Sequence, residues 1–309
     1  MNKVIYSICI ANLNMEKTIE VCLRSVLDQI DQRFEVIVVD DGSTDNSVNI
    51  LKKLSNEYIN LRIFELKRDK QRTLAQTRNV SVSYAQGDYL ILNIDCDDYW
   101  YPYIKDFVEV YHQIEKVKGT NFLLSGQQIN MGKSDFLRSH GPYRNGHMVE
   151  DRDLWFRLAK IDSYIPLEHV VFRKRMKLTH KQTWKKLIIV STIILSDELR
   201  SFRKPYSIFL EIFQKSHSQS KKYRILKLLL LPAAFVRSKL KGSLDLFAGS
   251  PEWPRLKQEA LKMSGTVEEF FTIRGKSFDF TQLSEIGKLI FNYSSKEKQI
   301  EEIFSEYKK

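Results

Sequence analysis

Cysteine is scarce in this sequence of 309 residues, and no two cysteines have the spacing of a metal-binding or redox motif. Cys9, Cys22 and Cys96 lie far apart, so the sequence predicts neither a disulfide framework nor a zinc site. Cys9 lies within an apolar run and is expected to belong to the core. This cysteine usage is typical of a protein in a reducing compartment.

Long apolar runs are also missing. The sequence contains no uninterrupted apolar run of about 18 residues, so it predicts no transmembrane helix. Its first residues lead directly into a strand-like segment and lack the apolar stretch of a secretory signal peptide. Together with the cysteine usage, these features favour a cytoplasmic protein.

The composition indicates a globular protein with an uneven charge distribution. Hydrophobic residues make up 43% of the chain and charged residues 28%. The length is sufficient for one large core or two domains. Of the net charge of +11, residues 1–172 carry −3 and residues 173–309 carry +14. Such a basic half predicts contact with an anionic surface, either a membrane or nucleic acid.

Strands and helices alternate along the first hundred residues. Apolar runs predict strands over residues 4–10, 34–39, 61–66 and 88–94, and helical periodicity predicts helices over residues 17–29, 47–54 and 74–85. Residues 121–130 are a further apolar strand region. This alternation predicts an α/β fold with βαβ units and a largely parallel, Rossmann-like sheet.

Two of the predicted strands end in acidic clusters. Asp40 and Asp41 follow one strand, and Gly42 then permits a tight turn before three potential helix N-caps, Ser43, Thr44 and Asp45. The second cluster consists of Asp95, Asp97 and Asp98. Ligands of open α/β sheets bind outside the carboxyl ends of the strands. Carboxylates at that edge suit Mg²⁺ or Mn²⁺, and on an extended segment Asp95 and Asp97 would point the same way.

A third acidic pair, Glu150 and Asp151, begins a predicted helix whose apolar residues, Leu154, Trp155 and Leu158, mark a core face. Taken alone, each acidic cluster is also compatible with a surface turn or a helix cap. Together, the clusters favour a metal site with a carboxylate base at the front of a helix.

Four motifs in order resemble those of glycosyltransferase family 2, which has the nucleotide-sugar-binding GT-A fold. The resemblance covers about the first half of the chain. The motifs are residues 10–14 after the first strand, residues 39–45, residues 95–98 with Pro102 beyond them, and residues 150–155. Arg78, Asn79 and residues 85–89 occupy the stretch that usually precedes the metal motif in this family.

The resemblance assigns roles to individual residues. Asp95 and Asp97 would form the DxD motif, with Asp97 preferred as the direct ligand of Mn²⁺ or Mg²⁺ and Asp95 nearer the ribose. Asp151 would be the general base of an inverting transfer. The remaining nucleotide-sugar-binding positions would be Ala11, Asn12, Asn14, Asp40, Asp41 and Arg78.

The implied donor is a UDP-, GDP- or dTDP-sugar, and the implied acceptor is a glycan or a lipid-linked glycan precursor. Leu13 stands where the family often has an aromatic residue that packs on the base, so the resemblance leaves the choice of base open. Nothing in the sequence identifies the acceptor.

The family motifs end near residue 172, which predicts a GT-A domain over residues 1–172 and a basic, mainly helical region over residues 173–309. Residues 173–241 contain 18 Lys and Arg residues but 3 Asp and Glu residues, a net charge of +15. Two short apolar runs, residues 184–195 and 223–237, have basic flanks. This pattern favours a helical region that binds an anionic membrane on its cytoplasmic face. A basic subdomain that packs on the catalytic domain, or binds acceptor or a partner, is the alternative.

Two other classes of function are considered. A nucleotidyltransferase also joins a βαβ domain to carboxylate-bound Mg²⁺, but it requires a basic, Gly-rich loop where this chain has Asn12, Leu13 and Asn14. A non-catalytic polyanion-binding protein would use only the basic half, yet Asp95, Asp97 and Asp151 are intact. The sequence therefore favours a glycosyltransferase that does not bind nucleic acid.

Overall fold

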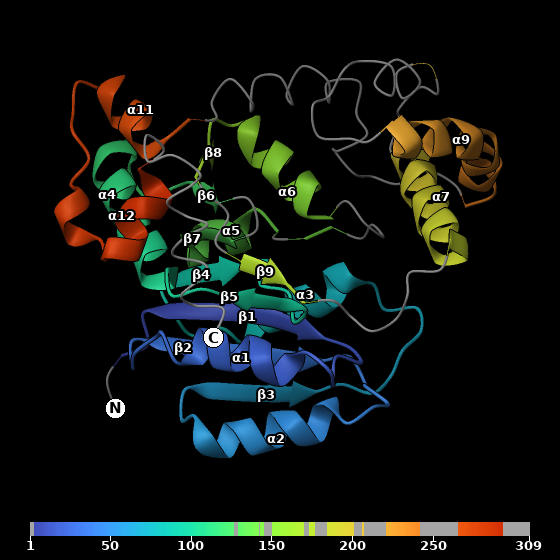
Figure 1. Cartoon of the computed structure of the whole chain (residues 1–309), viewed down its shortest axis with the longest axis horizontal. Coiled ribbons are helices and arrows are strands. Elements are labelled where there is room, and N and C mark those ends of the chain that lie inside the picture. Colours follow the sequence, from blue (N-terminus) through green and yellow to red (C-terminus); the bar gives the residue numbers. More distant parts are fainter. Residues whose placement is uncertain are drawn as a thin grey trace.

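The computed structural model places a mixed seven-stranded sheet at the centre of the molecule (Figure 1). It describes residues 3–126, 129–141, 143–144, 150–169, 173–176, 184–200, 206, 221–241 and 265–292. The strand order is β3-β2-β1-β4-β7-β6-β8. Strands β1 to β4 and β8 are Tyr6–Asn12, Phe34–Asp40, Leu61–Glu65, Tyr89–Leu92 and Tyr164–Pro166.

Most neighbouring strands are parallel, which confirms the predicted largely parallel sheet. Strand β1 pairs with β2 and β4, and β2 pairs with β3, all in parallel register. The apolar strand region predicted at residues 121–130 contains β6 (Leu123–Gly126) and the start of β7 (Ile129–Lys133). They are antiparallel to each other, and β7 is also antiparallel to β4.

Side chains alternate between two hydrophobic cores, one on each face of the sheet, because successive strand residues point to opposite sides. One core includes Ile8, Ile10, Val36 and Val38, and the other includes Cys9, Ile37 and Val39. Helices cover both faces: α1 Ile19–Leu27, α2 Ser47–Glu57, α3 Leu74–Tyr84, α4 Ile104–Lys118, α5 Ser134–Ser139 and α6 Glu150–Ala159. Cys9 is a core residue, as expected.

The described part of the C-terminal region is mainly helical, as predicted. It contains α7 Trp184–Arg200, α9 Lys221–Lys241, α11 Val267–Thr272, the short 3-10 helix η2 Phe280–Gln282 and α12 Glu285–Phe291. Helices α7 and α9 lie side by side at the right of Figure 1. None of the described helices is both long and apolar enough to cross a bilayer.

Segments beyond residue 172 also complete the first unit. Strand β9 (Arg173–Arg175) pairs antiparallel with β5 (Asp98–Trp100). Phe271, Leu283 and Phe291 are buried in the same core as α1 and α4. The boundary at residue 172 itself lies outside the described residues, and the division into two domains stays a prediction.

Candidate functional site

The first corner of the site lies where β1 and β2 end side by side. Asn12 is paired in register with Asp40. The buried Asp40 carboxylate accepts hydrogen bonds from Asn12 Nδ2 at 2.7 Å, from the Ser43 hydroxyl at 2.5 Å and from the Ser43 backbone N–H at 2.8 Å. Ser43 therefore serves the Asp40 turn, and helix α2 begins only at Ser47. These three hydrogen bonds hold the buried Asp40 carboxylate within the turn, so Asp40 supports the corner.

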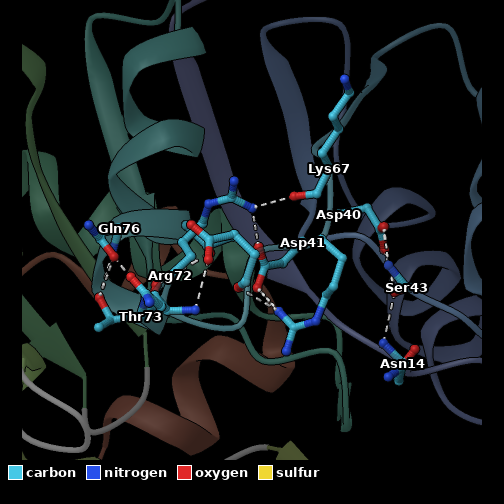
Figure 2. A network of polar contacts seen from close by, with 12 residues as sticks. Asn14, Asp40, Asp41, Ser43, Lys67, Arg72, Thr73 and Gln76 are labelled. Atoms are coloured by element: carbon cyan, nitrogen blue, oxygen red, sulfur yellow. Dashed lines mark hydrogen bonds and ion pairs between the residues drawn. The ribbon is translucent and has the colours of Figure 1, made fainter.

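Asn14 extends this corner toward the following turn (Figure 2). Its backbone has a φ of 55°, and its N–H donates to Ser43 Oγ at 2.8 Å. Its side-chain oxygen accepts a hydrogen bond from the Thr44 N–H at 2.8 Å. Ala11, one residue before Asn12 in β1, accepts a hydrogen bond from the Cys96 thiol through its carbonyl oxygen. The segment after β1 is therefore tied both to the Asp40 turn and to the second acidic segment.

The Asp41 carboxylate binds two arginines that the sequence did not assign to the site. Its carboxylate accepts hydrogen bonds from Arg72 Nη1 and, at 2.9 Å, from Arg68 Nη1. Both arginines come from the charged loop between β3 and α3, and Arg72 also binds the Lys67 carbonyl (Figure 2). The sequence does show a run of charged residues after a strand. It does not show that this run pairs with Asp41, because the pairing is a long-range contact.

Gly42 makes this arrangement possible. Its φ is +73°, and an added Cβ would lie 2.5 Å from the Arg68 backbone nitrogen. A side chain there would be strained by the backbone conformation and would also push the arginine loop away from Asp41. The turn predicted at Gly42 is confirmed. The close approach of two loops is a further reason why this position needs glycine.

The second acidic segment is a turn, so the expected extended conformation of residues 95–97 is wrong. Asn93, at a φ of 66°, redirects the chain after β4, and the Asp98 N–H donates to the Asp95 carbonyl at 3.2 Å. The turn nevertheless gathers carboxylate oxygens of Asp95, Asp97 and Asp98 within 4.8 Å of one another. Such a set of hard oxygen donors fits Mn²⁺ or Mg²⁺. Asp98 was not predicted as a ligand and is fully buried.

Arg78 joins this segment to the start of α6. From α3, its guanidinium donates to Asp95 Oδ1 at 3.1 Å through Nη2 and to Glu150 Oε1 at 3.2 Å through Nη1. The same group lies 5.5 Å from the centre of the Tyr143 ring. Tyr143 is in turn fixed by its hydroxyl, which donates to Asn93 Oδ1 at 2.5 Å. The acidic turn and the start of α6, which lie 17 and 72 positions from Arg78 along the chain, thus meet at one cation.

Glu150 and Asp151 occupy different environments although they are adjacent. Glu150 is buried, and burial raises the pKa of its carboxyl group from 4.5 to about 7, while the charge of Arg78 opposes the rise. Its Oε2 has no hydrogen-bond partner among the described residues. Asp151 is only half-buried and accepts a hydrogen bond from the Arg152 N–H at 2.7 Å. Asp151 can therefore meet a ligand, whereas Glu150 faces the protein interior.

Asp153 has a structural role in this helix. It is fully buried and accepts hydrogen bonds from Arg144 Nη2 at 2.6 Å and from Arg157 Nε at 2.9 Å. Arg157 Nη2 in turn donates to the Gly141 carbonyl at 2.8 Å, so Asp153 anchors the chain before α6. A buried carboxylate that is held by two guanidinium groups is poorly placed to accept a proton from a ligand.

Three curated proteins illustrate what this chain is similar to. TarS of Staphylococcus aureus strain Mu50, a poly(ribitol-phosphate) beta-N-acetylglucosaminyltransferase, is 29% identical over 171 residues, 49% of this chain and 29% of that protein. WfaP of Escherichia coli, named as a UDP-Glc:alpha-D-GlcNAc-diphosphoundecaprenol beta-1,3-glucosyltransferase, is 35% identical over 30% of this chain and 36% of that protein. Glycosyltransferase GlyG of Streptococcus pneumoniae serotype 4 is 30% identical over 42% and 40%. The matches span less than half the length of these relatives.

Two solved structures are also similar. A mannosyltransferase, PcManGT of Pyrobaculum calidifontis, in complex with GDP-Man and Mn²⁺, is 14% identical, with a TM-score of 0.49 and coverage of 89% of this chain and 85% of that chain. The structure of S. aureus TarS 1-349 in complex with UDP is 17% identical, with a TM-score of 0.47 and coverage of 94% and 98%.

The family profile gives a match of a different kind, because it covers residues 7–161, half of the chain. This range includes all four motifs and every predicted site residue. The largely parallel sheet with acidic strand ends agrees with the GT-A architecture that the resemblance implies. The chain therefore belongs to glycosyl transferase family 2.

Proposed function

We propose that this protein is an inverting, metal-dependent glycosyltransferase that moves a sugar from a nucleotide sugar to an acceptor hydroxyl. The observation that carries the proposal is the double contact of Arg78 with Asp95 and Glu150. It places the carboxylate cluster and the start of α6 on either side of one cation. A metal site and a candidate base so arranged match the needs of a displacement with a diphosphate leaving group.

The donor nucleotide would bind at the corner of β1 and β2. Asp41 is the acceptor group there for an N–H of the base, with Arg68 and Arg72 holding its carboxylate in place. Ala11, Asn12, Asn14 and Asp40 shape the corner. UDP-, GDP- and dTDP-sugars all remain candidates, because Leu13 offers no ring to select among bases by stacking.

The diphosphate would lie between this corner and the acidic turn. Asp97, with Asp95 and the buried Asp98, would hold Mn²⁺ or Mg²⁺, which neutralises the leaving diphosphate when bound. Arg78 adds a fixed positive charge beside Asp95.

Asp151 is the proposed general base. Its carboxylate would take the proton from the acceptor hydroxyl while the hydroxyl oxygen attacks the anomeric carbon, and the bond to the diphosphate breaks on the opposite side. One such displacement inverts the configuration of the sugar. Glu150 is the weaker candidate, because it is buried against Arg78.

The proposed acceptor is a lipid-linked or cell-surface glycan precursor, reached from the cytoplasmic face of an anionic membrane. The names of two relatives support this class: that of WfaP includes a diphosphoundecaprenol-linked sugar, and that of TarS includes poly(ribitol-phosphate). The basic charge of residues 173–241 supports the same location, because cytoplasmic leaflets are anionic.

The test is an assay of nucleoside diphosphate release from UDP-, GDP- and dTDP-sugars with Mn²⁺, combined with calorimetric titration of the donor. We expect Asp97→Ala to abolish metal-dependent donor binding. Asp151→Asn should keep donor affinity but lower the rate of transfer to an acceptor about 10²–10⁴-fold, because an amide cannot accept the proton.

Asp162→Asn serves as the matched control, because Asp162 is an exposed aspartate whose carboxylate forms a surface ion pair with Lys118. It should behave as the wild type in both measurements. Metal-dependent donor binding that survives in Asp97→Ala would overturn the proposed metal site. Transfer by Asp151→Asn within a factor of a few of the wild type would move the base elsewhere.

A further inference from the structure

Helix α9 carries an apolar stripe on its exposed side. The exposed fractions are 58% for Ile225, 73% for Leu229, 58% for Val236 and 82% for Leu240. These four residues are spaced by 4, 7 and 4 positions, so they lie on one face of the helix. Pro232 and Ala233, also exposed, fill the gap in the middle of the stripe.

The stripe is separate from the packing of α9 on its neighbour. Ala234 is buried together with Leu195 of α7, and this small core is completed by Leu199, Leu228, Leu230 and Leu231. Arg200 Nη2 also donates to the Lys241 carbonyl at 3.2 Å, which joins one end of α7 to one end of α9. The pair of helices α7 and α9 therefore has its own core, and the stripe faces away from it.

The other apolar residues of the described chain with the highest exposed fractions occur singly, whereas the less exposed Ile188 and Ile189, at 40% and 50%, are adjacent on α7. Ile59 and Ile273, with exposed fractions of 94% and 81%, lie in different parts of the molecule. Single exposed apolar side chains are ordinary on protein surfaces, whereas a continuous exposed apolar patch marks an interaction site. The stripe on α9 is such a patch.

The charges around the stripe indicate which kind of partner binds it. Helix α9 contains seven Lys and Arg residues and no Asp or Glu residue. Lys239 and Lys241 are exposed beside the end of the stripe. A second copy of this helix would bring like charges together, whereas an anionic bilayer offers both phosphate groups for the basic residues and acyl chains for the stripe.

We propose that α9 lies in the headgroup region of an anionic membrane, with Ile225, Leu229, Val236 and Leu240 inserted among the acyl chains. This inference deepens the membrane location proposed above and rests on it, but it does not depend on the chemistry of transfer. In Figure 1 helices α7 and α9 lie on the side toward which β3 points, the side of the carboxyl ends of the parallel strands. The candidate site would then open toward the same membrane as a lipid-linked acceptor.

The first experiment is co-sedimentation of the full chain with vesicles of phosphatidylglycerol and phosphatidylcholine, or of phosphatidylcholine alone, without donor or metal. We expect binding to the anionic vesicles that high salt weakens without abolishing, because the apolar contribution is insensitive to salt. Replacement of the four stripe residues by Gln should weaken binding by at least about tenfold, since a single inserted aliphatic side chain can account for that factor.

The matched control is Ile59→Gln combined with Ile273→Gln, which replaces two strongly exposed isoleucines away from α9. It should bind as the wild type. Lys239→Gln with Lys241→Gln should reduce the part of the binding that depends on salt. Wild-type protein that pellets with neither kind of vesicle, or a stripe variant that binds like the wild type, would overturn the proposal.

A second measurement avoids the quadruple variant. Leu229→Cys, labelled with an environment-sensitive dye, should show a blue shift of its emission on addition of anionic vesicles, and Ile59→Cys with the same label should not. The competing occupant of the stripe is a second copy of this chain, and sedimentation without vesicles tests for it. A wild-type dimer that is lost in the stripe variant would make the stripe an interface between copies. Because these readouts need no turnover, an inactive protein that still binds would refute only the proposed catalysis.

Discussion

Neighbouring carboxyl groups at the start of α6 differ in what they can do. Glu150 is buried against Arg78, and its pKa is raised to about 7, mainly because burial disfavours the charged form. Asp151 is half-buried and next to it in sequence. A residue type alone therefore does not identify the base, because helix geometry turns one carboxylate toward the core and the next toward solvent.

The raised pKa of Glu150 predicts a pH dependence of stability in the metal-free protein. Between pH 4.5 and about 7 the folded state holds a proton that the unfolded chain releases, so this contribution to stability is present below pH 4.5 and is lost as the pH rises to about 7. As the pH rises, the free energy of unfolding of the wild type should therefore fall by up to about 3 kcal/mol more than that of Glu150→Gln. Urea unfolding with a chelator at pH 5 and pH 8 measures it.

The exposed Glu268 provides the control for this prediction, as Glu268→Gln. Its free energy of unfolding should follow the wild-type pH curve. A Glu150→Gln curve that runs parallel to the wild type over the whole range would show that Glu150 is ionised normally in the folded state.

At the scale of elements, α12 is docked on α4 by one buried carboxylate. Asp106 of α4 accepts hydrogen bonds from the Ser284 backbone N–H and hydroxyl, both at 2.7 Å. Ser284 Oγ then accepts a hydrogen bond from the Gly287 N–H at 3.0 Å and so caps α12. Gly287 must be small, because an added Cβ would lie 2.4 Å from the Asp106 carboxyl carbon.

This contact predicts a strong coupling between two helices that lie far apart in sequence. A double-mutant cycle of Asp106→Ala and Ser284→Ala should give a coupling free energy of about 1–3 kcal/mol in chemical unfolding, because the bonds are charge-assisted and partly buried. The exposed pair Glu285 and Lys288 is the matched comparison, for which we expect less than about 0.5 kcal/mol. Additive single effects for Asp106 and Ser284 would contradict the docking role.

At the scale of the whole molecule, the C-terminal region contributes to the first core. Six residues beyond position 172 are buried in it: Val267, Phe271, Phe278, Leu283, Ile290 and Phe291. Gln113 of α4 also donates to the Asp279 carbonyl at 2.9 Å and accepts a hydrogen bond from the Asp279 N–H at 3.0 Å. The last described helices are therefore part of the first core and pack on α4.

A chain that ends at residue 172 should consequently fail to unfold cooperatively in a thermal scan, because α4 would expose the apolar face that these residues cover. In the full chain, Phe271→Ala and Phe291→Ala should each lower the melting temperature, and Ile273→Ala, at an exposed position, should not. A fragment of residues 1–172 that melts cooperatively within a few degrees of the full chain would contradict this view of the core.

The order of strands and helices in the first hundred residues followed from sequence, because apolar periodicity and turn residues are local signals. The turn at Gly42 and the acidic strand ends were predicted on the same basis. Helix α4 and the pairing of β6 with β7 were not predicted, because short apolar runs are ambiguous. The turn at residues 95–97 was not predicted either, because it follows Asn93, whose positive φ and hydrogen bond with Tyr143 belong to the folded chain.

The amino-acid sequence by itself determined which residues carry charge at the ends of the strands, and hence the family and the class of chemistry to expect. Only the tertiary structure decided which charges meet. Arg78 reaches Asp95 and Glu150, Arg72 reaches Asp41, and four apolar residues of α9 face solvent, because folding brings together or separates groups that are distant along the chain. Local patterns fix elements, whereas long-range packing sets the partners and the burial of each side chain.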